Sequence, residues 1–157
     1  MTEIHYNKAM QLLSENDIPL IQVGGADASI VDLLEKEIAV QLPKSYRRLL
    51  TEFGALSFEG NMISGIGKNG VYGDNFGSVY FSTTELRKNE EITDKMLHLM
   101  PTGYGPYFVI DCAQLNQRSE GPVYEINELG YKHGMKKVAE SFGEFLLNEV
   151  NMLPENQ

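Results

Sequence analysis

The chain has 157 residues, a length that suits one compact domain and buries roughly 70% of the surface that the unfolded chain would expose. Hydrophobic residues make up 42% and charged residues 22% of the chain, which excludes a disordered or collagen-like protein. The formal net charge of −9 repels nucleic-acid phosphates and anionic lipid surfaces, so we expect no direct nucleic-acid partner and no membrane partner.

The N-terminal residues and the cysteine content bear on the cellular compartment. Residues 1–10, MTEIHYNKAM, lack the basic segment, apolar run and cleavage site of a secretory signal, and no apolar run approaches the ~18 residues of a membrane span. We therefore expect a cytoplasmic protein. The single cysteine, Cys112, excludes an internal disulfide and a paired-cysteine metal site, and we expect neither a metal nor another cofactor.

Two amphipathic patterns near the N-terminus predict helices. The first helix covers residues 2–15, and its apolar stripe consists of Tyr6, Ala9, Met10 and Leu13. A second helix is expected to begin after a cap at Asp27 or Ser29, because Ser29 and Asp32 approximate a capping box. The residues of this helix that we expect to face the core are Ile30, Leu33, Leu34 and Ile38.

A third helix is predicted between Pro43 and Gly54. Proline suits the first helical turn, where its missing N–H would have had no partner, and glycine supplies a left-handed C-terminal cap. The apolar stripe of this helix consists of Leu42, Tyr46, Leu49, Leu50 and Phe53.

The middle of the chain changes character. Residues 54–77 hold seven glycines among apolar side chains, which favours short strands and tight turns. Residues 79–81 are predicted to form a further strand. Ser82, Thr83 and Thr84 are then candidate caps for a polar, exposed helix over residues 85–94.

The stretch GIGKNG at residues 65–70 fits the G-x-G-x-x-G spacing of dinucleotide-binding loops. Such a loop needs a helix directly after it, because the helix N-terminus holds the pyrophosphate. Here the sequence VYGDNFGSVYF follows, and its glycines and aromatic residues disfavour a helix. We therefore predict a hairpin turn and no nucleotide site.

The last third of the chain predicts two strands and a closing helix. YFVID at residues 107–111 and PVYEI at residues 122–126 are rich in strand-forming residues. Ser141 and Glu144 have the spacing of a capping box. The buried stripe expected for the last helix consists of Phe142, Phe145, Leu146 and Val150, and residues 152–157 are expected to fray.

This order of elements predicts an α+β fold. We expect a single domain over residues 1–157, with a core of about residues 29–150. Its mainly antiparallel, twisted sheet is expected to pack against the N-terminal and C-terminal helices.

The chain offers few candidates for catalysis. Cys112 could be a nucleophile with His98 or His133 as its base. A lone cysteine beside a strand is more often a small buried hydrophobe, and we favour that inert interpretation. His5, His98 and His133 are too far apart in sequence to suggest a metal site, and Asp111 is expected to cap or turn the chain.

Aromatic residues on glycine-rich loops and a small acidic group are the candidates for partner binding. Tyrosine is a common anchor at protein interfaces, although core packing would also explain most of these residues. A solvated surface would explain equally well the acidic group, which consists of Glu90, Glu91 and Asp94. The same holds for a basic group that consists of Lys132, His133, Lys136 and Lys137. The predicted partner-binding residues are Tyr72, Asp74, Glu90, Glu91, Asp94, Tyr104 and Tyr107.

Several segments, in this order, resemble the SUKH superfamily, which includes fungal cell-wall-assembly regulators and many bacterial immunity proteins. The segments are SIVDLLEKEIAVQLPKSYRRLLTEFG, a glycine-rich middle, PYFVID, GPVYEI and VAESFGEFL, and they span about residues 29–147. The chain departs from many such proteins in having no tryptophan near the GPV segment, so its subfamily stays open.

The resemblance implies a protein without a catalytic site that binds a cognate polymorphic toxin domain. The expected toxin is a basic nuclease or other nucleic-acid-modifying domain, which an acidic inhibitor can reach quickly and occlude stoichiometrically. A regulatory module that binds an endogenous protein is the alternative, and an enzyme that uses Cys112 comes third. We expect a monomer or a weak homodimer.

Overall fold

The computed structural model describes residues 3–73 and 77–153. In chain order, the helices are α1 (Glu3–Glu15), α2 (Ala28–Ile38), α3 (Lys44–Phe53), α4 (Val79–Lys88) and α5 (Phe142–Asn151). The strands are β1 (Ile21–Gln22), β2 (Leu56–Phe58), β3 (Asn61–Ile63), β4 (Met96–Pro101), β5 (Tyr107–Asp111), β6 (Val123–Ile126) and β7 (Met135–Ala139). Two short 3-10 helices cover Cys112–Gln114 and Tyr131–His133.

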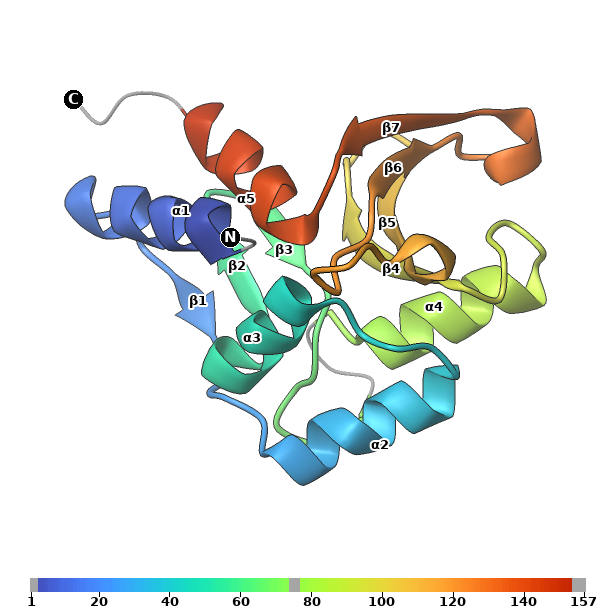
Figure 1. The fold of residues 1–157 in the computed structure, drawn as a ribbon, viewed down its shortest axis with the longest axis horizontal. Helices are drawn as coiled ribbons and strands as arrows, with labels where there is room; N and C mark the ends of the chain where they lie inside the picture. The colour runs from blue at the N-terminus through green and yellow to red at the C-terminus, as the bar shows by residue number, and fades with distance from the viewer. Residues whose placement is uncertain (1–2, 74–76, 154–157) are drawn as a thin grey trace.

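Two antiparallel sheets organise these elements (Figure 1). One has the strand order β1-β2-β3 and the other β4-β5-β6-β7, with neighbours paired in both. The backbone N–H of Ser64 donates to the carbonyl of Leu99 at 2.8 Å, which joins the end of β3 to β4. The predicted α+β class with antiparallel sheets is therefore confirmed.

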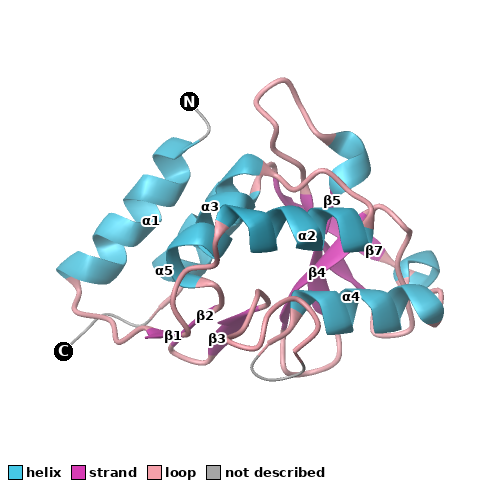
Figure 2. Ribbon diagram, turned by 90° about the horizontal axis from the view of Figure 1, so that it is seen from below, coloured by secondary structure: helices cyan, strands magenta, loops and turns pink. Residues whose placement is uncertain are grey.

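Helices cover the sheets from several sides. α1 and α5, the first and last helices, pack side by side (Figure 1). Figure 2 shows α2 and α4 together on the near side of the larger sheet. The main core runs through all of these layers, and its largest fully buried side chains include Tyr6, Tyr46, Phe58, Phe142 and Phe145.

Helix α2 begins at one of the two expected caps, and its inner face matches the prediction in part. Asp27 is the N-cap, whereas Ser29 lies inside the first turn, so the capping role of Ser29 is wrong. The buried face consists of Val31, Leu34 and Ile38, at spacings of three and four residues, while Leu33 is exposed. The predicted burial of Leu34 and Ile38 is confirmed. That of Leu33 is wrong, because Val31 and Leu33 are both apolar and only the packing partner selects which of them is buried.

Helix α3 has the predicted apolar stripe and begins with an unusual cap. Its N-cap, Pro43, has no side chain that can accept a hydrogen bond. The carboxylate of Glu120 accepts instead, from the backbone N–H of Ser45 at 2.9 Å and from its hydroxyl at 2.8 Å. The C-cap, Gly54, has a φ of +74°, and a Cβ there would lie 2.4 Å from the carbonyl oxygen of Gly24. Only glycine fits this close approach.

Residues 79–81 are the first turn of α4, so the predicted strand is wrong. The cap is Ser78, whose hydroxyl accepts from the backbone N–H of Phe81 at 3.1 Å. The proposed caps at residues 82–84 consequently lie inside the helix. This cap starts the helix despite the strand-favouring sequence Val-Tyr-Phe, because tertiary contacts outweigh propensity.

The glycine-rich segment forms the predicted turn at residues 65–70. Gly67 and Gly70 pair across it, and the N–H of Gly70 donates to the carbonyl of Gly67 at 3.1 Å. The next helix begins only at Val79. The interpretation of GIGKNG as a turn is confirmed.

The predicted strands at residues 107–111 and 122–126 are confirmed as β5 and β6, whereas β4 and β7 were not predicted. At the end of the chain, the hydroxyl of Ser141 accepts from the backbone N–H of Glu144 at 3.1 Å, which confirms the predicted cap of α5. Residues 154–157 of the predicted frayed tail lie outside the described residues.

Candidate partner-binding surface

Two of the predicted tyrosine anchors lie on the surface. Tyr72 is 55% exposed, and its ring packs edge-on against that of Tyr80, with the ring centroids 5.2 Å apart. Tyr104 is 73% exposed and lies in the hairpin that connects β4 to β5. Asp74, a third predicted residue, lies outside the described residues.

The acidic group follows the end of α4. Glu90 and Asp94 are exposed, as expected for a surface group. Glu91 differs, because it is half-buried and its carboxylate accepts from the hydroxyl of Tyr107 at 3.2 Å. Its backbone carbonyl also accepts from the N–H of Tyr131 at 2.9 Å. Glu91 therefore holds the 3-10 helix and the strand β5 in place.

Tyr107 is not on a loop, and that expectation is wrong. Strand β5 begins at Tyr107, and its side chain is only 7% exposed. It belongs to a second small core cluster with Ile92, Met96, Val109 and Ile126. Burial, together with the nearby carboxylate of Glu91, raises the pKa of the Tyr107 phenol above its usual range.

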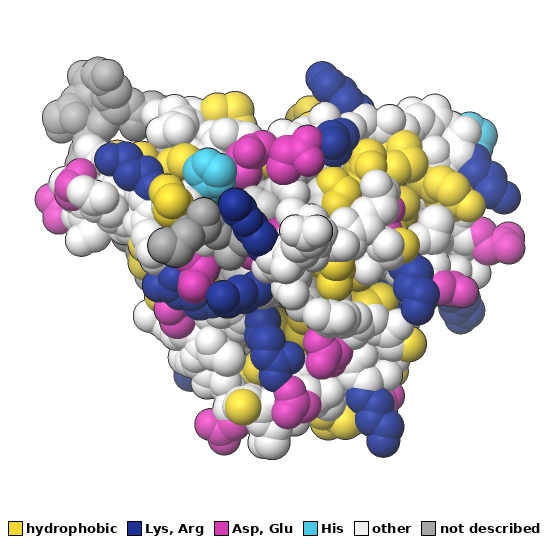
Figure 3. Space-filling view, in the orientation of Figure 1, with side chains coloured by type: hydrophobic (Ala, Val, Ile, Leu, Met, Phe, Trp, Pro, Cys, Tyr) yellow, Lys and Arg dark blue, Asp and Glu magenta, His cyan; other side chains and the backbone are white. Residues whose placement is uncertain are grey.

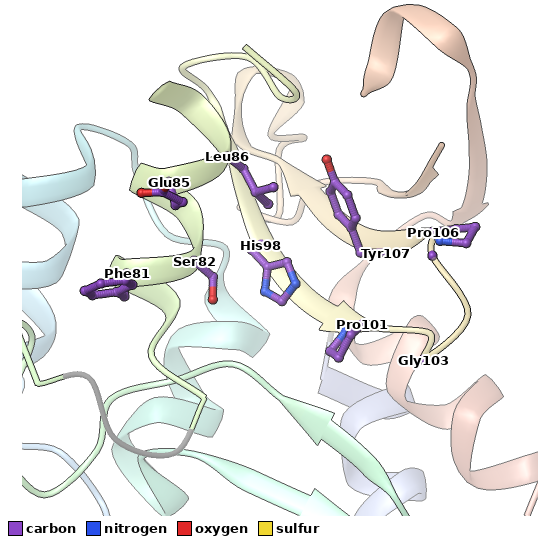
Figure 4. Close-up of a pocket in the computed structure, with 10 residues that line it drawn as sticks. Phe81, Ser82, Glu85, Leu86, His98, Pro101, Gly103, Pro106 and Tyr107 are labelled. Carbon is purple, nitrogen blue, oxygen red and sulfur yellow. The ribbon is translucent and has the colours of Figure 1, made fainter. Parts of the chain in front are cut away.

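A cavity of about 420 Å³ lies between α4 and the β4–β5 hairpin (Figure 4). We call it the α4 cavity. Ser82 and Leu86 of α4 point toward His98 of β4 and Tyr107 of β5, and Pro101 and Pro106 come from the hairpin. The lining is mainly apolar, and Phe81, which is 54% exposed, contributes to it from α4. Phe81 was not among the predicted residues.

His98 is the buried histidine in the wall of the α4 cavity. Its Nδ1 lies 2.8 Å from the hydroxyl of Ser64, and its backbone N–H donates to the hydroxyl of Thr83 at 3.0 Å. Burial lowers the pKa of His98 to about 4, so the ring is neutral at neutral pH. Ser64 is itself buried and does not line the cavity, so its hydroxyl is not presented to a substrate there.

Cys112 has the environment of a structural thiol. Its side chain is buried, and burial, reinforced by the adjacent carboxylate of Asp111, raises the thiol pKa to about 12. The thiol is therefore protonated at neutral pH, whereas a nucleophile needs the thiolate. Asp111 accepts from the backbone N–H of Ala113 at 3.0 Å, which confirms its predicted role as a cap.

Two further kinds of site are absent from residues 3–73 and 77–153. No group of three or more His, Cys, Asp or Glu side chains is arranged to hold a metal ion there. No helix in the same ranges is both long and apolar enough to cross a bilayer. Figure 3 shows acidic and basic side chains interspersed on the face it presents, rather than separated by sign.

These features define a small α+β domain with two antiparallel sheets and a neutral buried histidine. Aromatic and acidic side chains are exposed on its surface. The chain belongs to the SUKH family. The family model SUKH_6, described as SMI1-KNR4 cell-wall, matches residues 30–146, which is about three quarters of the chain. The resemblance seen in the sequence is thus confirmed, and proteins of this family are generally non-catalytic.

Proposed function

We propose that this protein is an immunity protein, which binds a cognate toxin domain and blocks it stoichiometrically. The observation that carries the proposal is membership of the SUKH family, a family of toxin immunity proteins. The net charge of −9 supports it, because a toxin that acts on nucleic acid carries positive charge around its substrate channel. Inhibition by occlusion requires no chemistry from the inhibitor.

We propose that the toxin contacts the α4 surface, which consists of Tyr72, Phe81, Glu85, Glu90, Asp94 and Tyr104. The three aromatic residues are exposed to more than half of their area, and exposed aromatic side chains bring large contact area at low entropic cost. The three acidic residues are exposed along and beyond α4. They would accelerate association with a basic partner, and salt would weaken this effect.

The first experiment uses the full chain as bait in a lysate of the source organism, at low and moderate salt, with mass spectrometry as the readout. We expect one basic, toxin-like domain at near-equal stoichiometry. Co-expression of this protein should then restore the growth of cells that produce the captured domain. A captured domain that is harmless to cells, or growth that this protein does not restore, would contradict the proposal.

The α4 surface is tested with the purified pair. Phe81→Ala should weaken binding by roughly tenfold or more, as truncation of an aromatic anchor does. Ile21→Ala is the matched control, because Ile21 is also exposed but lies on β1, away from α4 (Figure 1). The double variant Glu90→Lys with Asp94→Lys should mainly slow association, and Glu15→Lys on α1 should not. If the α4-surface variants and the control variants had equal effects on binding and association, the interface would lie elsewhere.

The alternative function is a regulatory module with an endogenous partner. The fungal relatives named by the resemblance motivate it. A deletion of the gene would then cause a defect in cells that contain no toxin, and the bait experiment would return a housekeeping protein.

A further inference from the structure

A second cavity, of about 500 Å³, lies between the end of α5 and the larger sheet, and we call it the α5 cavity. Phe108 lines it, whereas the neighbouring Tyr107 lines the α4 cavity. Successive side chains of a strand point to opposite faces, so the two cavities lie on opposite faces of the sheet. In Figure 3, which has the orientation of Figure 1, hydrophobic side chains gather in the region where Figure 1 shows β7.

The floor of the α5 cavity is aromatic. The rings of Phe108 and Phe145 lie against each other, with centroids 4.9 Å apart and an angle of 58° between the ring planes. Val138 of β7 adds an aliphatic wall. The face of an aromatic ring attracts cations, and a half-enclosed site strengthens the attraction because less water competes.

The rim of the α5 cavity is acidic. Glu149 of α5 and Glu125 of β6 both line it, and no lysine or arginine among the described residues does. Lys136 stands opposite Glu125 in the pairing of β6 with β7, yet it does not line the cavity. Two carboxylates and an aromatic pair that line the same cavity are a combination that a cation satisfies.

Glu149 has an unfavourable environment in the absence of a cation. Its carboxylate makes no hydrogen bond or ion pair with any described residue, and burial raises the pKa of this group. It also lies in the last turn of α5, where the partial negative charge of the helix carbonyl groups disfavours a carboxylate. A bound cation would relieve both costs.

We propose that the α5 cavity binds an arginine side chain presented by a protein partner. The aliphatic part of the arginine packs on Val138 and Phe145, and the planar guanidinium stacks on Phe108 between Glu125 and Glu149. A guanidinium suits this site better than an ammonium group, because it is planar, less strongly hydrated and able to contact carboxylates with two N–H groups. The inference does not depend on the toxin, since the cavity lies on the opposite face from the α4 surface.

The test uses Nα-acetyl-arginine N-methylamide as the probe, titrated into the full, isotope-labelled chain at neutral pH and low salt. We expect saturable changes in the amide signals of Phe108, Val138 and Glu149, with a millimolar dissociation constant. The matching citrulline derivative has nearly the same shape without the charge, and it should bind roughly tenfold more weakly.

Two variants locate the site. Glu149→Gln keeps the shape of the side chain and should weaken binding of the arginine probe by roughly tenfold. The variant should be at least as resistant to heat as the natural protein. Glu85→Gln, the matched control in the α4 cavity, should leave probe binding unchanged. Signal changes that map to the α4 cavity, equal binding of citrulline, tighter binding of the lysine derivative, or an unaffected Glu149→Gln variant would each overturn the proposal. Failure to find a toxin would not affect it.

Discussion

His98 should make the protein lose stability in mild acid. Burial holds its pKa at about 4 in the folded protein, whereas the unfolded chain has the ordinary value of 6.5. Between these two values the unfolded chain takes up a proton that the folded protein does not. Protonation therefore favours unfolding, and the free energy of unfolding falls as the pH decreases from 6.5 to about 4.

The size of this effect follows from the gap between the two pKa values. A gap from 6.5 to about 4 corresponds to about 3 kcal/mol. The side chain is only 9% exposed, so solvent screening reduces the figure little. Glu120 and Glu149 act in the opposite direction, because burial raises the pKa of each and their protonation in mild acid favours the folded state. The effect of His98 must therefore be isolated by comparison with a variant.

His98→Asn is the variant of choice, because its side-chain amide can replace Nδ1 in the hydrogen bond with Ser64 and does not titrate. Urea unfolding of both proteins, followed by circular dichroism at pH 7.5 and pH 4, gives the two free energies. The variant will be less stable at pH 7.5, since it loses ring contacts. Its loss between the two pH values should be smaller than that of the natural protein by about 3 kcal/mol, or about 1.5 M urea in the midpoint.

Parallel losses in the two proteins would refute this reasoning. They would mean that His98 is protonated as easily in the folded protein as in the unfolded chain. The His98 ring signals can also be followed directly by nuclear magnetic resonance, and a midpoint near 6.5 instead of about 4 would refute it equally.

Three other predictions concern single buried groups. Glu120→Ala removes both acceptors at the start of α3 and should lower the free energy of unfolding by about 2 kcal/mol, measured by urea titration, whereas Ser45→Ala should cost less. Cys112 should react with a disulfide reagent at pH 8 about a hundredfold or more slowly in the native protein than in urea, because its thiol is buried and protonated; equal rates would contradict this environment. Tyr46→Phe should cost about 1 to 3 kcal/mol in thermal unfolding, since the carbonyl of Ser64 loses the hydroxyl that donates to it at 2.6 Å; an unchanged melting temperature would mean that water replaces this bond.

The sequence predicted those elements whose apolar residues follow a clear period. α1, α3 and α5 each bury one stripe and leave the opposite face in water, so a spacing of three and four residues identifies them. Strand β4 is buried on both faces and shows no alternation, while β7 is a mainly exposed edge strand whose sequence, MKKVA, does not alternate between apolar and polar residues. Neither strand therefore carries the period-two signal, and both were missed.

The candidate surface was predicted only in part for a related reason. Tyr72 and Tyr104 were found because glycine-rich loops usually lie at the surface, and the same rule misplaced Tyr107. Phe81 was missed because its segment was taken for a strand instead of the first turn of α4. The two cavities depend on which helix covers which face of the sheet, and no local pattern in the sequence specifies that choice.

The contact between α1 and α5 sets the order in which the protein can be completed during synthesis. A ribosome adds roughly 5 to 20 residues per second, so α1 is made several seconds before α5 exists. Until Phe142–Asn151 has left the ribosome, the stripe of Tyr6, Ala9 and Leu13 lacks its packing against α5, although Tyr6 already has a partner in α3, where Glu52 accepts from its hydroxyl at 2.9 Å. A nascent or truncated chain that stops before α5 thus exposes apolar surface to chaperones and proteases, and only the chain that includes α5 can close its core.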